Sequence, residues 1–202
     1  MTRLPDAYFD RMYSASADPW RLGERWYDER KFAITLAVLP AARYRHAFEP
    51  GCSVGVLTEM LARRCDHVTA TDIAQAALDA ARRRLTTDNV TLLRRSVDQP
   101  WPATDFDLIV LSEVGYYLQP AALRGLLDRE LPRLTNPATV VAAHWRHSVE
   151  DYPMTGDQAN GVIGATAGLH RIGGYRDEDV SIEVFDTANA ASVAARTGVP
   201  GA

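Results

Sequence analysis

The sequence lacks the features that mark membrane, secreted and disulfide-bonded proteins. Its 202 residues contain no apolar run long enough to span a bilayer, and the N-terminus has no apolar signal-peptide core. Only two cysteines occur, Cys52 and Cys65, and both have the character of small buried residues rather than of a disulfide pair. There is no spacing of metal ligands, no internal repeat and no second domain. These absences predict a cytoplasmic protein that binds neither a metal nor a membrane.

Lysine is almost missing, and the net charge is small. Lys31 is the only lysine, a bias towards arginine that indicates genome composition rather than function. The net charge of −4 provides no general attraction to the phosphates of nucleic acids, so we expect no nucleic-acid partner. The length and the hydrophobic content of 47% fit an ordinary globular domain with its own core. Composition leaves the oligomeric state open.

One stretch organises the rest of the chain. Residues 44–48 can form a buried parallel strand, and Gly51 and Gly55 bracket a tight turn in which a ligand can approach the backbone closely. Apolar residues then recur at helical spacing, and a β-rich run at 68–71 ends at Asp72. This is the pattern of a βαβ unit that presents an acidic residue to a ribose.

The charge at this turn favours one nucleotide-like ligand over another. A dinucleotide-binding turn has the pattern G-x-G-x-x-G and holds a pyrophosphate at the helix N-terminus. Here the pattern is Glu49-x-Gly51-x-x-x-Gly55, and the carboxylate of Glu49 would repel phosphate but suit an ammonium group. S-adenosylmethionine carries an ammonium, a sulfonium and a ribose but no phosphate. We therefore expect S-adenosylmethionine rather than NAD, with a glycine turn kept only for packing as the alternative.

Strand and helix patterns alternate five times, which predicts an α/β fold with a doubly wound, mostly parallel sheet. The later strands are expected at 90–93, 106–111 and 138–143, and a closing pair at 169–176 and 180–186 would bring the sheet to seven. Ligands of such sheets bind outside the carboxyl ends of the strands. Five polar residues fall at or just past these ends: Glu49, Asp72, Asp98, Glu113 and His144.

The two ends of the chain have weaker patterns than its middle. Residues 1–19 predict an irregular or short-helical lead, and 24–39 predict a helix with apolar residues on two sides, as expected of a helix that caps the sheet. Tyr27 and Arg30 would then point toward the ligand turn, with plain core contacts of this helix as the alternative. Residues 148–168 predict a long loop with one short helix. The expected division is an N-terminal helical cap at 1–43, a Rossmann-like core at 44–187 and a weakly structured tail at 188–202.

Five groups of motifs between residues 8 and 186 carry a family resemblance. They are Asp18-Pro19-Trp20; Trp26-Tyr27 with Arg30-Lys31; Glu49-Pro-Gly-Cys-Ser-Val-Gly55; Ser112-Glu113-Val114 with Tyr116-Tyr117-Leu118; and His144-Trp145-Arg146-His147 with Asp151-Tyr152-Pro153. With these motifs the chain resembles the seven-stranded class I S-adenosylmethionine-dependent methyltransferases. More narrowly, it is similar to the nodulation protein S family, N-methyltransferases that act on the amines of chitooligosaccharides.

The resemblance implies S-adenosyl-L-methionine as the cofactor and S-adenosyl-L-homocysteine as its product. The residues that it implies at the cofactor are Trp20, Tyr27, Arg30, Glu49, Gly51, Asp72, Ile73, Val97, Asp98 and Ser112. Asp72 would take both ribose hydroxyls, and Asp98 would read the adenine amino group together with the backbone of Val97. Arg30 would hold the cofactor carboxylate, because a guanidinium offers a fork of donors. Trp20 would lie against the sulfonium or close the pocket.

A site for the methyl acceptor is expected where the methyl group would point. An amine must lose a proton during methyl transfer, so a nearby base is useful. Glu113 and His144 stand at adjacent strand ends, and we expect His144 to accept the proton and Glu113 to hold the acceptor or tune the charge of the site. The expected lining of the acceptor pocket is Tyr117, Trp145, Arg146, Asp151 and Tyr152. Aromatic rings with flanking polar groups suit a sugar, so the expected acceptor is a small molecule, an amine of an amino sugar or oligosaccharide, with a hydroxyl left open.

Two other classes of function stay open on the sequence. A NAD(P)-dependent oxidoreductase would use the same sheet, and Asp72 fits the ribose of NAD, but Glu49 and the missing third glycine count against it. A non-catalytic domain that binds an adenosyl ligand would also use this scaffold. The presence of Asp72, Glu113 and His144 together counts against that alternative.

Overall fold

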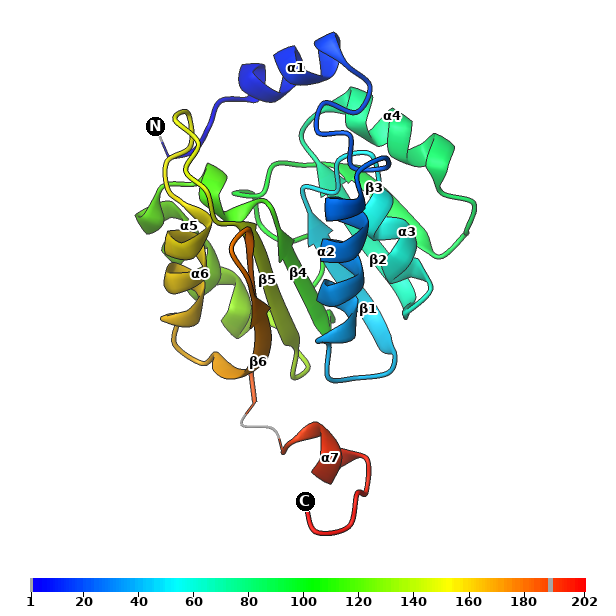
Figure 1. Cartoon of the computed structure of the whole chain (residues 1–202), viewed down its shortest axis with the longest axis vertical. Coiled ribbons are helices and arrows are strands. Elements are labelled where there is room, and N and C mark those ends of the chain that lie inside the picture. Colours follow the sequence, from blue (N-terminus) through cyan, green and yellow to red (C-terminus); the bar gives the residue numbers. More distant parts are fainter. Residues whose placement is uncertain (1, 189–190) are drawn as a thin grey trace.

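The computed structural model describes residues 2–188 and 191–202, and one seven-stranded sheet forms its centre (Figure 1). The strands are β1 Tyr44–Pro50, β2 Cys65–Asp72, β3 Val90–Arg94, β4 Leu108–Ser112, β5 Thr139–Trp145, β6 His170–Arg176 and β7 Val180–Asp186. Their order across the sheet is β3-β2-β1-β4-β5-β7-β6. The first five strands pair in parallel, whereas β7 runs antiparallel to β5 and to β6. The mostly parallel sheet predicted from the alternating pattern is confirmed.

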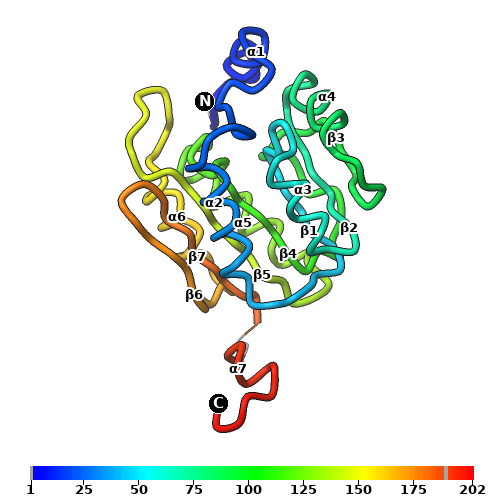
Figure 2. Tube along the Cα trace, turned by 45° about the vertical axis from the view of Figure 1, so that its right-hand side comes forward, coloured from blue at the N-terminus to red at the C-terminus, as the bar shows by residue number. Residues whose placement is uncertain are grey.

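Helices cover both faces of this sheet (Figure 2). They are α1 Asp6–Ala15, α2 Trp26–Ala37, α3 Val56–Ala62, α4 Gln75–Arg84, α5 Pro120–Glu130, α6 Gly156–Gly164 and α7 Val193–Arg196, with 3-10 turns η1 Gly115–Tyr117 and η2 Leu131–Arg133. Phe32 of α2 and Leu61 of α3 are buried in the core on one face. Leu127 of α5 and Ile163 of α6 are buried in the core on the other face. The chain is therefore doubly wound, as the sequence predicts.

The central strand β4 is buried on both faces, which explains its continuous apolar sequence. It begins at Leu108 rather than at Phe106, where the apolar run starts. Phe106 is fully buried but stands outside the ladder. The carboxylate of Asp107 accepts the backbone N–H groups of Arg45 and His46, each at 2.9 Å, and the Asp107 backbone N–H donates to the carbonyl of His46 at 3.1 Å, so side chain and backbone together hold this end of β1.

Helix α6 begins inside the predicted 148–168 loop and touches the end of β5. Thr155 caps it, because the Thr155 hydroxyl accepts the backbone N–H of Gln158 while the Gln158 side chain accepts the backbone N–H of Thr155. A Cβ atom at Gly156 would lie 2.1 Å from the carbonyl oxygen of Trp145. Only glycine allows the helix to start this close to the strand.

The N-terminal segment is tied to the chain that follows β4. Arg3 and Leu118 form an isolated antiparallel bridge, and the backbone N–H of Leu4 donates to the carbonyl of Tyr117 at 2.9 Å. Helix α1 then lies beyond the carboxyl ends of the strands, at the top of the view in Figure 1. The N-terminal segment, expected to be irregular or a short helix, thus contains the helix α1, whose residues Phe9 and Tyr13 line the candidate site.

The C-terminal tail separates from the sheet after β7 (Figure 1). Of the tail predicted from 188 onward, residues 189 and 190 lie outside the described residues, and α7 follows them. Across the described chain, every helix is too short or too polar to cross a membrane.

Candidate functional site

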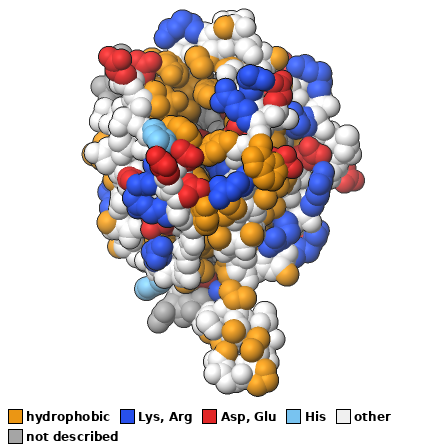
Figure 3. Space-filling view, in the orientation of Figure 1, with side chains coloured by type: hydrophobic (Ala, Val, Ile, Leu, Met, Phe, Trp, Pro, Cys, Tyr) orange, Lys and Arg blue, Asp and Glu red, His pale blue; other side chains and the backbone are white. Residues whose placement is uncertain are grey.

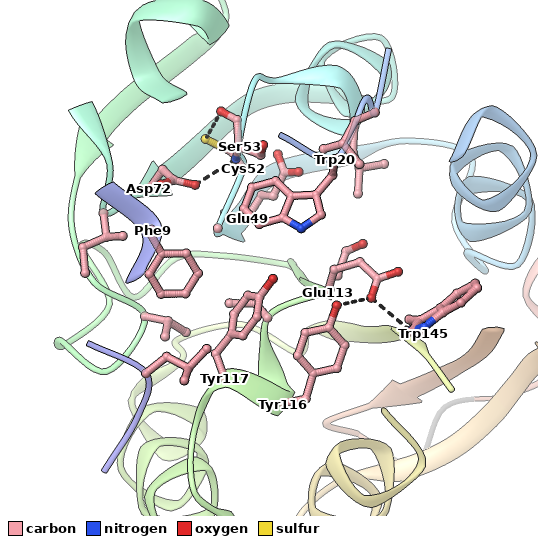
Figure 4. Close-up of a pocket in the computed structure, with 18 of the residues that line it drawn as sticks. Phe9, Trp20, Glu49, Cys52, Ser53, Asp72, Glu113, Tyr116, Tyr117 and Trp145 are labelled. Atoms are coloured by element: carbon pink, nitrogen blue, oxygen red, sulfur yellow. Dashed lines mark hydrogen bonds between the residues drawn. The ribbon is translucent and has the colours of Figure 1, made fainter. Parts of the chain in front are cut away.

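A cavity of about 600 Å³ lies at the carboxyl ends of β1, β2 and β4 (Figure 4). Segments far apart in the sequence line it: the N-terminal segment with α1, helix α2, the turn after β1, and the stretches that follow β2, β3, β4 and β5. This is the edge at which the sequence predicts the ligand site, because parallel strands place their carboxyl ends side by side.

The molecular face in Figure 3 carries charges of both signs. Arginine and lysine side chains alternate with aspartate and glutamate, and hydrophobic side chains lie between them. A nucleic-acid site would require basic side chains gathered on one face or along one helix. The face in this view offers no such patch.

The turn after β1 forms one end of the cavity. Gly51, Ser53 and Gly55 all have left-handed backbone angles, with φ of 76°, 52° and 80°. Asp72, at the end of β2, holds this turn: its Oδ2 accepts the backbone N–H of Ser53 and its Oδ1 accepts that of Ala74, both at 2.9 Å. Burial raises the pKa of Asp72, and the backbone donors oppose that rise. The carboxylate keeps further lone pairs for a ligand.

Glu49 lies beside this turn, with 3% of its surface exposed. Its Oε2 accepts the hydroxyl of Thr58 at 2.6 Å. Burial raises the pKa of Glu49 to about 8, against the opposing effect of the Thr58 hydrogen bond. A buried carboxylate of this kind gains from a cationic ligand group, because such a group stabilises its ionised form.

Aromatic side chains of the N-terminal segment close the cavity from above the turn. The hydroxyls of Tyr13 and Ser53 are 2.6 Å apart, and the Tyr13 ring meets Trp20 edge to face with centroids 5.5 Å apart. Phe9 meets Tyr117 in the same way at 5.0 Å. Figure 4 shows Phe9 on the same side of the cavity as Asp72 and Trp20 beside Glu49.

Glu113 forms the other end of the cavity, just after β4. Its backbone has a left-handed φ of 54°, an uncommon conformation for a residue with a side chain. Glu113 Oε1 accepts the Lys31 ammonium at 2.8 Å, while its Oε2 accepts the Tyr116 hydroxyl and, at 2.9 Å, the backbone N–H of Trp145. Lys31 also donates to Asp28 at 3.0 Å. Four hydrogen bonds thus fix the Glu113 carboxylate and its counterion Lys31.

Charge, rather than burial, decides the ionisation at Glu113. Burial would raise its pKa, but the charge and hydrogen bond of Lys31 and the hydrogen bond of Tyr116 hold the pKa of Glu113 below its usual value. Burial likewise opposes the charge on Lys31, yet Glu113 and Asp28 keep the pKa of Lys31 raised. Burial raises the pKa of Asp28 by more than the charge and hydrogen bond of Lys31 lower it, so the pKa of Asp28 is raised.

Aromatic rings flank Glu113 on two sides. Tyr116 stacks on Tyr152 with centroids 4.9 Å apart, and Tyr117 meets Tyr152 edge to face at 5.0 Å. Opposite them, Tyr27 and Trp145 meet edge to face at 5.2 Å. A flat acceptor could therefore lie between two aromatic walls with a carboxylate between them.

Most of the predicted site residues line this cavity. They are Trp20, Tyr27, Glu49, Gly51, Asp72, Ile73, Val97, Ser112, Glu113, Tyr117, Trp145 and Tyr152. Other lining residues were not predicted as site residues, although Lys31 and Tyr116 belong to the motifs above: Arg3, Phe9, Tyr13, Arg25, Asp28, Lys31 and Tyr116. For Lys31 a signal existed, since it is the only lysine of the chain.

Four predicted side chains lie outside the cavity lining, and three of them are held by other partners. Arg30 donates to Asp177 at 2.9 Å and to Tyr175, which is a correction to its expected contact with a cofactor carboxylate. Arg146 pairs with Asp157 at 3.1 Å. The remaining two are Asp98, which pairs with Arg3 at 3.0 Å, and Asp151, which is exposed.

His144 also requires correction, because it is fully buried beneath the site. Its Nε2 accepts the backbone N–H of Gly115 at 3.0 Å, so the proton of the ring lies on Nδ1, which donates to Asn160 at 2.7 Å. Burial holds the pKa of His144 below its usual value. Both nitrogens are used inside the protein, and the expected role of His144 as the proton acceptor does not fit this geometry. It instead connects the turn after β4 to α6.

Replacing His144 by alanine should therefore destabilise the fold strongly. The change leaves the Gly115 N–H without an acceptor and Asn160 Oδ1 without a donor, and it removes a buried ring; together these losses should lower the free energy of unfolding by about 3 to 5 kcal/mol. The exposed His147, paired with Asp179, is the matched control, and His147→Ala should change it by less than about 1 kcal/mol. Urea unfolding measures both. Equal losses would contradict a structural His144.

Comparison with known proteins identifies relatives of this chain. A profile of the family described as Nodulation protein S (NodS) matches residues 9–149. The nodulation protein S of Rhizobium tropici is 34% identical over 125 residues, which are 61% of this chain and 52% of that protein. The nodulation protein S of Bradyrhizobium diazoefficiens is 29% identical over 142 residues, covering 65% of this chain and 68% of that protein. The chain thus spans about half the length of the Rhizobium tropici relative.

Solved structures share the fold. A Pseudomonas syringae protein, assigned as a methyltransferase, is 37% identical, with a TM-score of 0.67 over 80% of this chain and 99% of that one. The N-methyltransferase NodS from Bradyrhizobium japonicum WM9, in complex with S-adenosyl-L-homocysteine, is 23% identical, with a TM-score of 0.79 over 89% and 96% of the two chains. The fold is that of the class I methyltransferases, as the motifs predict. The profile match covers more than half of the sequence, and the chain belongs to the nodulation protein S family.

Proposed function

We propose that this protein is an S-adenosylmethionine-dependent methyltransferase that acts on the amine nitrogen of a small molecule, an amino sugar or a short oligosaccharide. One observation carries the proposal. A single cavity has a carboxylate-bearing turn at one end, suited to an ammonium and a ribose, and the Glu113 carboxylate between aromatic walls at the other. Residues 1–43 would serve as the cap and 44–187 as the catalytic core.

The residues at the turn fit the cofactor that the family uses. When bound, S-adenosylmethionine supplies an activated methyl group. Glu49 would face its ammonium, Asp72 its ribose hydroxyls, and Ile73 and Val97 its adenine. Arg25, the lining residue just before α2, replaces Arg30 as the donor for its carboxylate.

The charges near Glu113 favour an amine over a neutral acceptor. Asp28, Lys31 and Glu113 together carry two negative charges and one positive charge, so the group keeps one net negative charge. An ammonium entering the cavity would be attracted by that charge, and its desolvation would be offset. Glu113 would hold the acceptor nitrogen, while Tyr117 and Tyr152 would exclude water beside it.

The names of the relatives support the same proposal. The Bradyrhizobium japonicum protein is described as an N-methyltransferase and was solved with S-adenosyl-L-homocysteine. That description supports S-adenosylmethionine as the cofactor of this chain and a nitrogen atom as the methyl acceptor. The sugar part of the proposal rests on the stacked rings of Tyr116 and Tyr152 next to the Glu113 carboxylate, an arrangement that suits the flat face of a sugar ring.

Calorimetric titration with S-adenosylhomocysteine and, separately, with NADH tests the cofactor. We expect saturable binding of S-adenosylhomocysteine alone, because the Glu49 carboxylate opposes a pyrophosphate. The ammonium of this ligand should lower the raised pKa of Glu49, so binding near pH 7 should release a proton. Titration in two buffers of different ionisation enthalpy measures that release. Binding of NADH alone would overturn the methyltransferase proposal and favour an oxidoreductase.

A further inference from the structure

The residues beside Glu113 make a continuous chain of proton-carrying atoms. Lys31 Nζ lies 2.8 Å from Glu113 Oε1 and 3.0 Å from Asp28 Oδ1. Asp28 and Lys31 stand one helical turn apart on α2, whereas Glu113 comes from the end of β4. Both distances are those of ordinary charged hydrogen bonds, so a proton can pass from one atom to the next.

Both ends of this chain line the cavity, and the Glu113 end is the more exposed of the two. Glu113 Oε2 already accepts the Tyr116 hydroxyl and the Trp145 backbone N–H. Oε1 accepts only Lys31, so one lone pair of this atom remains. The side chain of Glu113 is 21% exposed, against 3% for Lys31 and 5% for Asp28. A ligand therefore meets the chain at Glu113 Oε1.

We infer that Glu113, Lys31 and Asp28 form a proton relay that removes the proton of the acceptor amine, an inference that rests on the proposed function. The N–H bond of the acceptor breaks, its electron pair stays on nitrogen, and the proton bonds to Glu113 Oε1. Lys31 gives one of its protons to Asp28 Oδ1, and the electron pair that this leaves on Nζ takes the proton from Glu113 Oε1. Lys31 is an ammonium before and after, and the group changes from one net negative charge to none.

The environment gives this relay a direction. Lys31, Tyr116 and His144 surround Glu113, and the pKa of Glu113 is held low. Lys31 and Arg25 are the cations near Asp28, and its burial keeps the pKa of Asp28 raised in spite of them. The raised pKa of Asp28 and the lowered pKa of Glu113 both favour movement of the proton from Glu113 to Asp28. Since Asp28 itself lines the cavity, the proton can pass to water once the product has left.

Because Lys31 is the only lysine, its signal can be observed without assignment. The protein is labelled with ¹³C at the Cε of lysine, and one NMR resonance is followed against pH in the absence of any ligand. We expect an inflection above 3.8, the ordinary pKa of aspartate, from protonation of Asp28. Asp28→Asn should abolish the inflection, because asparagine keeps an oxygen for Lys31 but cannot take a proton. Glu29→Gln, an exposed charge change on the same helix, should preserve it.

Steady-state kinetics with a chitosan tetramer as the acceptor measures how the loss of the relay changes turnover. Asp28→Asn should lower kcat/KM about 100-fold at neutral pH, where the amine arrives protonated, and progressively less as pH rises and the free amine arrives. A structural role of Asp28 would instead give the same loss at every pH. A pH-independent loss, or an inflection that persists in Asp28→Asn, overturns the relay. If the wild-type protein binds S-adenosylhomocysteine but leaves the tetramer unmethylated, the proposed acceptor fails, and the NMR titration still decides the relay.

Discussion

Asp72→Ala should weaken the binding of S-adenosylhomocysteine at least about 100-fold. The carboxylate serves two purposes at once: it accepts the backbone N–H groups of Ser53 and Ala74, and its remaining lone pairs would accept the ribose hydroxyls. Hydrogen bonds to a charged group contribute about 1.5 to 3 kcal/mol each, so the loss of two corresponds to about 3 kcal/mol or more of binding free energy. Calorimetric titration measures the change in Kd.

The matched control is Asp66→Ala on the same strand. Asp66 is exposed and pairs with Arg43 at the surface, and an exposed pair contributes about 1 kcal/mol at most. Its replacement should leave the Kd unchanged. Asp72→Ala should also lower the stability of the ligand-free protein, because two buried N–H groups lose their acceptor, so both titrations belong at a temperature where the variants are folded. An unchanged Kd for Asp72→Ala would remove this residue from the cofactor site.

The fold was predictable because local patterns report on it directly. Each strand of a doubly wound sheet is covered on both faces, so strands such as β4 appear as apolar runs, and the intervening helices have helical periodicity. The boundaries were less predictable, since they depend on single contacts across the sheet. The start of β4 shows this: just before Leu108, the Asp107 side chain accepts two backbone N–H groups of β1, and the Asp107 backbone N–H donates to the carbonyl of His46 at 3.1 Å.

Part of the site was predictable from position alone. Glu49 is the second-last residue of β1, Asp72 is the last residue of β2 and Glu113 directly follows β4, and the carboxyl ends of parallel strands share one edge. His144 shows the limit of that argument. Because β5 continues to Trp145, His144 is still a strand residue, and its side chain points to the face that α6 covers. Position near a strand end does not say on which face a side chain lies.

Other parts of the site depend on contacts between distant segments. Lys31 and Asp28 lie at helical spacing on α2, but their importance comes from Glu113, 82 residues further along the chain. Asp98 is held by Arg3, 95 residues before it. Sequence periodicity contains no information on such pairs, so the sequence indicated an acidic site without its counterion.

Glu113→Gln should lower kcat about 1,000-fold with the chitosan tetramer, while S-adenosylhomocysteine binds as before. The variant removes the atom that receives the acceptor proton and the net negative charge that attracts an ammonium, and a positioned base contributes about 100- to 10,000-fold. The protein should still fold, because Lys31 keeps its ion pair with Asp28 at 3.0 Å and the buried ammonium is not left alone. Steady-state kinetics and calorimetry of the same preparation measure the two effects.

The separation of these two effects is what assigns Glu113 to the acceptor end of the cavity. Glu24→Gln is the control, since Glu24 carries the same charge just before α2 but is exposed and paired with Arg21. It should change neither kcat nor Kd. A Glu113→Gln variant with normal kcat and weakened S-adenosylhomocysteine binding would move Glu113 to the cofactor end and leave the amine without a base. A loss of kcat alone, with Asp72→Ala losing binding, would establish that the two carboxylates serve two different ligands in one cavity.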